Sequence, residues 1–177
     1  MVRVRNAVAV LWLSSGAVAL LPGAGRVSRC RVALSSQESD EVPGSGETIS
    51  LQAQFERALV LQRCGDVDGA LEEYDTFIAA AKQLNVSQKD YAEVLTNKGA
   101  LHVKKGERKT ARQCFEDALA GRNVGSAHVN LALLDIADRD VESARRRCLV
   151  AVELRDDPRT VATAQKLLAD IAARTGR

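Results

Sequence analysis

The feature that most constrains this chain is an alanine that recurs at one fixed distance after a turn. The turns are Gly65-Asp66, Gly106-Glu107 and Arg139-Asp140, and the alanines five positions after the first residue of each turn are Ala70, Ala111 and Ala144. In the first two stretches a large residue, Tyr74 or Phe115, follows four positions later. Two antiparallel helices approach closely only where one of them presents a small side chain. The recurrence therefore predicts a helix–turn–helix unit that occurs three times.

The segment before each turn carries a small residue at a matching position: Ala58, Gly99 and Ala132. No proline lies between Pro43 and Pro158, so nothing interrupts helices over this interval. We expect the helix-packing positions of the repeats to be Ala70, Tyr74, Gly99, Ala111, Phe115, Ala132 and Ala144.

These residues resemble the tetratricopeptide repeat (TPR), a helix–turn–helix unit of about 34 residues. The resemblance covers roughly residues 50–158 and is strongest in the second unit, which holds Gly99, Gly106, Ala111, Phe115 and Ala118. The usual tryptophan of the first helix is absent, and Gln54, Leu95 and His128 stand in its place. The first interval also carries extra residues around QLNVSQKD, which indicates lengthened helices or a longer loop.

The resemblance implies an all-α fold, a right-handed α-solenoid of three TPR-like repeats. An ordinary helical bundle is the alternative. After Pro158, the segment TVATAQKLLADIAART has its apolar residues on one helical face, which predicts a C-terminal capping helix. We therefore predict a helical domain over 51–177, preceded by a flexible linker over 38–50.

The first 37 residues differ from the rest of the chain. They hold five arginines and no acidic residue, with an apolar run near the start, as targeting segments do. We predict a transit leader over 1–37 and a plastid (chloroplast) location after its removal, with mitochondrion and secretion as alternatives. The apolar run over 7–21 is shorter than the roughly 20 residues of a membrane helix, so we expect no stable membrane span.

Residues suited to catalysis are sparse. The two histidines, His102 and His128, are far apart, and no phosphate-binding loop, HExxH or CxxC motif is present. Three of the four cysteines, Cys64, Cys114 and Cys148, fall within helical patterns, where cysteine is usually an apolar filler. We expect no enzyme activity, no catalytic residue, no cofactor and no metal ion.

The resemblance places a concave groove along the first helices of the repeats, where family members bind a peptide or a partner helix. The groove residues we assign are Arg63, Asn97, Lys104, Asn130 and Leu133, with Val129 and Ile136 as further groove-facing positions. An asparagine amide can donate to and accept from a peptide backbone. Only Asn97 matches the family's carboxylate clamp, so we expect no such clamp.

We therefore expect a protein–protein interaction module, an adaptor or assembly factor for a protein or peptide partner. An RNA-processing factor and a structural subunit of an enzyme complex are the alternatives. Five cations within residues 104–112 could attract nucleic acid, but the chain is only 3% aromatic and offers few stacking platforms. The groove could instead be covered by the C-terminal helix or by a second copy of the chain, which leaves homo-oligomerisation open.

Overall fold

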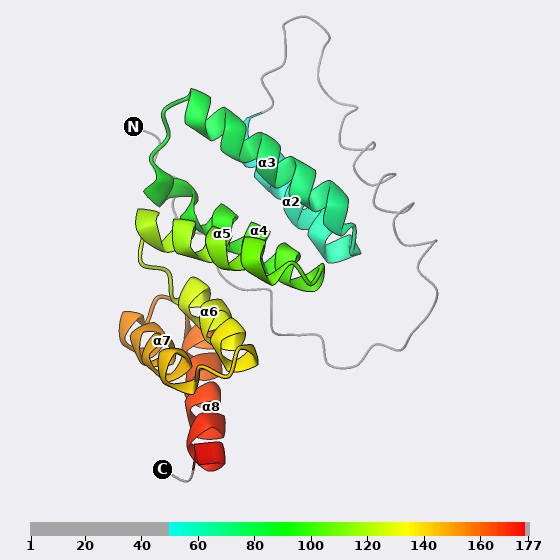
Figure 1. The fold of residues 1–177 in the computed structure, drawn as a ribbon. Helices are drawn as coiled ribbons and strands as arrows, with labels where there is room; N and C mark the ends of the chain where they lie inside the picture. Colours follow the sequence, from blue (N-terminus) through cyan, green and yellow to red (C-terminus); the bar gives the residue numbers. More distant parts are fainter. Residues whose placement is uncertain (1–49, 176–177) are drawn as a thin grey trace, which may run out of the picture. The chain divides into compact units, whose positions relative to one another are not determined.

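The structure, a computed structural model, describes residues 50–175 and is all-helical over that range, with no strand (Figure 1). The prediction of an all-α fold is confirmed for these residues. The helices are α2 (Leu51–Cys64), α3 (Val67–Gln83), the 3-10 helix η1 (Gln88–Tyr91), α4 (Ala92–Lys104), α5 (Arg108–Gly121), α6 (Gly125–Ala137), α7 (Val141–Leu154) and α8 (Pro158–Thr175). The predicted leader and the predicted linker, except Ser50, lie outside the described residues. No described helix combines the length and the apolar character needed to cross a bilayer.

The described residues form two compact units, one ending at Ser87 and the other beginning at Gln88. The first unit is the helical pair α2–α3. Ser50 accepts a hydrogen bond from the Ala53 amide and so caps α2, as a serine at this position commonly does. Between the helices, the ring of Phe55 packs against Tyr74 and Phe77, with ring centroids 6.2 Å apart in each case.

The same turn closes all three helical pairs. The residue in the left-handed conformation is Gly65, Gly106 or Arg139, with φ of 85°, 81° and 66° respectively. In each turn this residue donates its N–H to the carbonyl three positions earlier, and the next residue donates to the carbonyl five positions earlier. This is the hydrogen-bond pattern of the Schellman motif, which satisfies carbonyls at a helix C-terminus. The three turns lie at the positions where the sequence repeats.

In the second unit, α4 packs along α5, and α6 packs along α7. Gly99 on α4 lies directly against Phe115 on α5, whose side chain is fully buried. The extra residues around QLNVSQKD form the end of α3, a short loop and η1. The Gln88 side chain donates to the Asp117 carbonyl oxygen on α5 at 2.7 Å, which holds η1 beside the second pair.

The C-terminal helix α8 packs mainly on α7 and also contacts α6. Their shared core consists of the buried residues Val129, Ala132, Ala144, Cys148, Ala151, Ala164 and Ile171. Leu167 and Leu168 of α8 and Val152 of α7 pack against this core. The helix therefore covers one side of the third pair.

Candidate binding surface

Two asparagines in the second unit have amides without partners. Asn97 on α4 and Asn130 on α6 are half-buried, and neither side chain hydrogen-bonds to any described residue. Each lies nine residues before the left-handed residue of its turn, Gly106 or Arg139, and α4 contacts α6. The polar atoms of neither amide are among the buried side-chain atoms that lack a partner, so both amides remain open to a polar ligand.

Exposed apolar side chains accompany these amides. Leu133 on α6 is 45% exposed and Val103 on α4 is 41% exposed, and both are among the exposed large hydrophobic residues of the described chain. Leu133 is three residues after Asn130 and therefore lies close to the same side of α6. An apolar ligand group placed over Leu133 would remove apolar surface from water, which favours binding.

The assigned groove residues are divided between the two compact units. Asn97, Lys104, Asn130 and Leu133 lie on the contacting helices α4 and α6, where Lys104 is exposed at the end of α4. Arg63 is exposed in the last turn of α2, which belongs to the first unit. The structure therefore places four of the five on one pair of neighbouring helices.

Two further groove-facing positions belong to the core instead. Val129 is buried among residues of α6, α7 and α8, and Ile136 packs against the same cluster. The sequence pattern does not separate the solvent-facing from the core-facing part of α6, because apolar residues occur all round this helix. Val129 and Ile136 thus belong to the core that α6 shares with α7 and α8, while Asn130 and Leu133 keep solvent contact.

The residues assigned to helix packing are all buried. Ala70 and Tyr74 lie in the first unit, where the Tyr74 hydroxyl donates to Oε1 of Gln62 at 2.9 Å. Those of the second unit are Gly99, Ala111, Phe115, Ala132 and Ala144. Large side chains at the glycine and alanine positions of this set would separate the helices.

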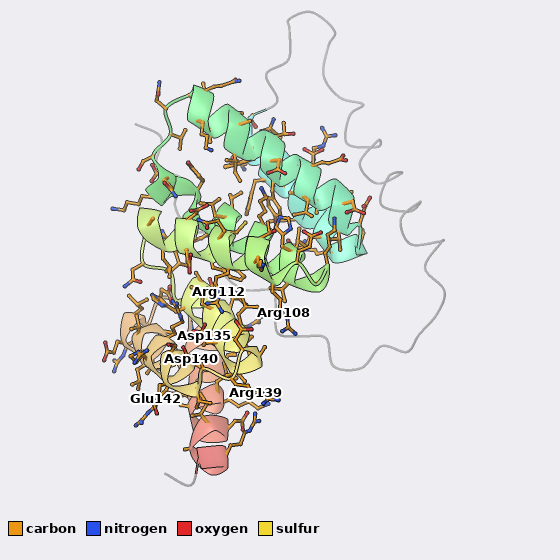
Figure 2. The ribbon with its side chains drawn as sticks, in the orientation of Figure 1. Arg108, Arg112, Asp135, Arg139, Asp140 and Glu142 are labelled. Atoms are coloured by element: carbon orange, nitrogen blue, oxygen red, sulfur yellow. The ribbon has the colours of Figure 1, made fainter. Side chains whose placement is uncertain are left out.

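An ion network behind the candidate surface was not anticipated from the sequence. Asp135 on α6 has a side chain only 5% exposed, and it accepts hydrogen bonds from Arg112 on α5 at 2.7 Å and Arg147 on α7 at 2.8 Å. Arg112 also pairs with Asp138 at 2.8 Å. Figure 2 shows Arg112 and Asp135 near one another within this unit. The network joins the second helical pair to the third.

Asp156, which looks like an ordinary solvated turn residue in the sequence, also has a structural role. Its carboxylate accepts a hydrogen bond from the Gly125 amide at 2.7 Å and so caps the N-terminus of α6 from the α7–α8 connection. A Cβ on Gly125 would lie 2.5 Å from the Asp156 carboxylate, so a larger residue at this position would displace that side chain. The two residues are 31 positions apart in the sequence, and no local sequence motif predicts their contact.

The two histidines occupy different environments. Nδ1 of His102 pairs with Glu107 at 2.7 Å, and this hydrogen bond lowers the pKa of the Glu107 carboxyl. Nε2 of His128 pairs with Asn123 at 2.6 Å. Partial burial and the nearby charge of Arg147 lower the pKa of His128, against a weaker opposing effect of Asp156.

The cysteines that the structure describes as free, Cys114 and Cys148, are buried in helix interfaces. Burial raises the pKa of the Cys148 thiol to about 11, which keeps it protonated and unreactive near neutral pH. Among the described residues, no group of three or more His, Cys, Asp or Glu side chains could hold a metal ion.

No family model matches the chain, and no curated protein matches it. Among solved structures, the chain is similar to the crystal structure of BtubC (BKLC) from P. vanneervenii, with a TM-score of 0.65 and 19% sequence identity. The match covers 84% of this chain and 65% of that chain. At this identity the likeness concerns the fold alone, and it supports an all-helical, repeat-like fold.

Proposed function

We propose that roughly residues 50–158 form three TPR-like repeats of a right-handed α-solenoid, with α8 as the capping helix. The three Schellman turns and the matched burial of Ala70, Ala111 and Ala144 support this assignment. The contacts of α6 with both α4 and α5 support stacking of the second pair on the third. One pair alone would leave an apolar face in water, and stacking removes it.

We propose further that the protein is a non-enzymatic interaction module that binds a peptide or helix of another protein along α4 and α6. The observation that carries this function is that the half-buried amides of Asn97 and Asn130, at equivalent positions of adjacent helices, have no partner among the described residues. A peptide backbone offers alternating donors and acceptors, so each amide can bond it twice.

Apolar contact would supply most of the binding free energy. Each square ångström of apolar surface removed from water contributes about 25 cal/mol. Leu133 and Val103 are exposed by 45% and 41%, so a partner side chain can cover them without displacing core residues. The amides then fix the direction and register of the bound segment, since a buried polar group without a partner is costly.

The cellular role we propose is an adaptor or assembly factor in a plastid. The plastid assignment depends on residues 1–37, which lie outside the described residues. A fluorescent protein fused behind residues 1–37 should enter plastids. Import into mitochondria, or secretion, would contradict the plastid location. Neither result would affect the proposed binding function.

The binding function is tested by selecting peptides from a displayed random library on the immobilised full-length protein. Selected peptides should bind in solution, and their affinity should fall about tenfold or more in the double variant Asn97→Ala/Asn130→Ala, since each lost hydrogen bond costs about 0.5–1.5 kcal/mol. The matched control is Gln83→Ala, which removes an exposed amide of α3 in the other unit.

Peptides that bind the double variant and the native protein equally would contradict the proposed surface. Recovery of no binding peptide would contradict the proposed function as a peptide-binding module. Circular dichroism of each variant checks that its helices remain intact, so that loss of binding is not loss of fold.

A further inference from the structure

A second exposed surface lies at the turns of the unit that begins at Gln88. It comprises the residues around the α4–α5 turn and the residue at the apex of the α6–α7 turn: Val103, Lys104, Lys105, Arg108, Lys109 and Arg139. We call it the turn-edge surface. All six residues are exposed, and Figure 2 shows Arg108 and Arg139 on neighbouring turns of this unit.

The turn-edge surface carries an excess of positive charge. Residues 104–112 contain five cations and one acid, Glu107, which is already paired with His102 and Lys105. Arg108, Lys109 and Arg139 have no ion pair or hydrogen-bonded side-chain partner among the described residues. Of the acids next to Arg139 in the sequence, Asp138 pairs with Arg112 and Asp140 caps α7.

The positions of these cations disfavour the fold rather than support it. Arg139 has φ of 66° where the other two turns have glycine, and this left-handed conformation is costly for a residue with a Cβ. Arg108 and Lys109 lie in the first turn of α5, which carries no acidic residue, and cations at a helix N-terminus oppose the helix dipole. Unpaired cations that occur together on adjoining turns, at positions that do not favour folding, are available to a partner outside the chain.

We propose that the turn-edge surface binds an acidic segment of another protein, one that combines carboxylates with at least one apolar side chain. The carboxylates pair with Arg108, Lys109 and Arg139, and the apolar side chain covers Val103, which directly precedes the cations at the end of α4. Val103 favours a protein segment over a nucleic acid, since a solvent-exposed aliphatic residue offers no stacking platform to a base. This surface does not include Asn97 or Asn130, but it shares Val103 and Lys104 with the candidate surface along α4 and α6.

The test uses the full-length protein and a fluorescein-labelled peptide of repeated Glu-Glu-Leu triplets, with a Gln-Gln-Leu peptide and poly-uridine RNA as comparison ligands. Fluorescence anisotropy should show binding of the acidic peptide that weakens as salt rises. Arg139→Gly should reduce the affinity about threefold, and Arg108→Gln/Lys109→Gln about tenfold, as expected for one and two exposed ion pairs.

The matched control is Arg155→Gly. Arg155 is also exposed, also has positive φ (49°), and follows α7 at the end away from the α6–α7 turn. Both glycine variants lose the same charge and gain the same backbone freedom, so only their places differ. Arg155→Gly should leave the affinity unchanged.

Equal weakening by Arg139→Gly and Arg155→Gly would overturn the proposal, because it would reduce binding to net charge. Equal binding of the glutamine peptide, absence of binding, or tighter binding of RNA at the same salt concentration would also overturn it. A loss of affinity in these variants would not be caused by unfolding, because removal of these cations relieves strain. Thermal melts should therefore show that the variants are at least as stable as the native protein.

Discussion

Gly99 and Phe115 face each other across the α4–α5 interface so closely that a Cβ on Gly99 would lie 2.6 Å from Cε1 of Phe115. Phe115 is fully buried, and the Cβ of Cys114 would lie only 3.1 Å from the added atom. The ring therefore has little room to move aside. The close approach of α4 and α5 depends on this pairing of a residue without a side chain and an aromatic ring.

Gly99→Ala should consequently destabilise the protein, although alanine is the better helix former. Its helix propensity favours folding by about 1 kcal/mol, whereas overpacking of a buried site costs about 1–3 kcal/mol. We expect a net loss of about 1 kcal/mol in urea unfolding, and a smaller loss when Gly99→Ala is introduced into Phe115→Leu. A rise in stability for Gly99→Ala alone would show that the two helices are not in tight contact.

The Asp135 network predicts a contrast between two carboxylates that share Arg112. Asp135→Asn should cost about 2–4 kcal/mol of unfolding free energy, because it leaves two arginines without their buried charge partner. Asp138→Asn should cost less than about 1 kcal/mol, since the Asp138 side chain is 54% exposed. Urea unfolding of both variants measures the difference, and equal losses would argue against a buried network.

The lowered pKa of His128 predicts that the stability of the protein changes with pH. Its pKa is lowered in the folded protein, so the unfolded chain binds a proton more readily. The stabilising contribution is therefore present above the ordinary histidine pKa of about 6.5 and is lost as the pH falls below it. The loss of stability between about pH 7.5 and 5.5 should be smaller in His128→Gln than in the native protein. An identical pH dependence of the two proteins would exclude His128 as a source of acid sensitivity.

The left-handed conformation of the turn residues predicts opposite effects on stability when a glycine is removed from one turn and introduced into another. Gly106→Ala should lower stability by about 1 kcal/mol, because φ of 81° suits glycine and strains alanine. Arg139→Gly should raise stability by a few tenths to about 1 kcal/mol for the same reason. Thermal melts of both variants check this. A less stable Arg139→Gly would mean that the Arg139 side chain supports the fold by a contact of its own.

The sequence was sufficient to place the turns and the close contacts between helices. Gly65, Gly106 and Arg139 occupy one register, and small residues such as Ala111 and Ala144 follow at a constant distance, because the helical repeat imposes both. Local geometry sets these features, so they leave a local pattern. The all-helical structure follows from the same periodicity.

The long-range polar contacts could not be predicted in this way. Asp135 lies between Leu134 and Ile136 without any distinguishing motif, and its partners are 23 and 12 residues away. Asp156 likewise reaches a helix N-terminus far along the chain. The division of α6 into a core side and an exposed side depends on where α8 packs, which periodicity within α6 does not specify.

The central claim, that Asn97 and Asn130 together contact a bound protein segment, is tested most directly by the NMR signals of their side-chain amides. Variants Asn97→Ala and Asn130→Ala assign the two pairs of signals by their disappearance. On titration with a peptide selected on the native protein, both pairs should shift with one shared dissociation constant. If neither pair moves while the peptide is bound, the amides of α4 and α6 are not the binding site.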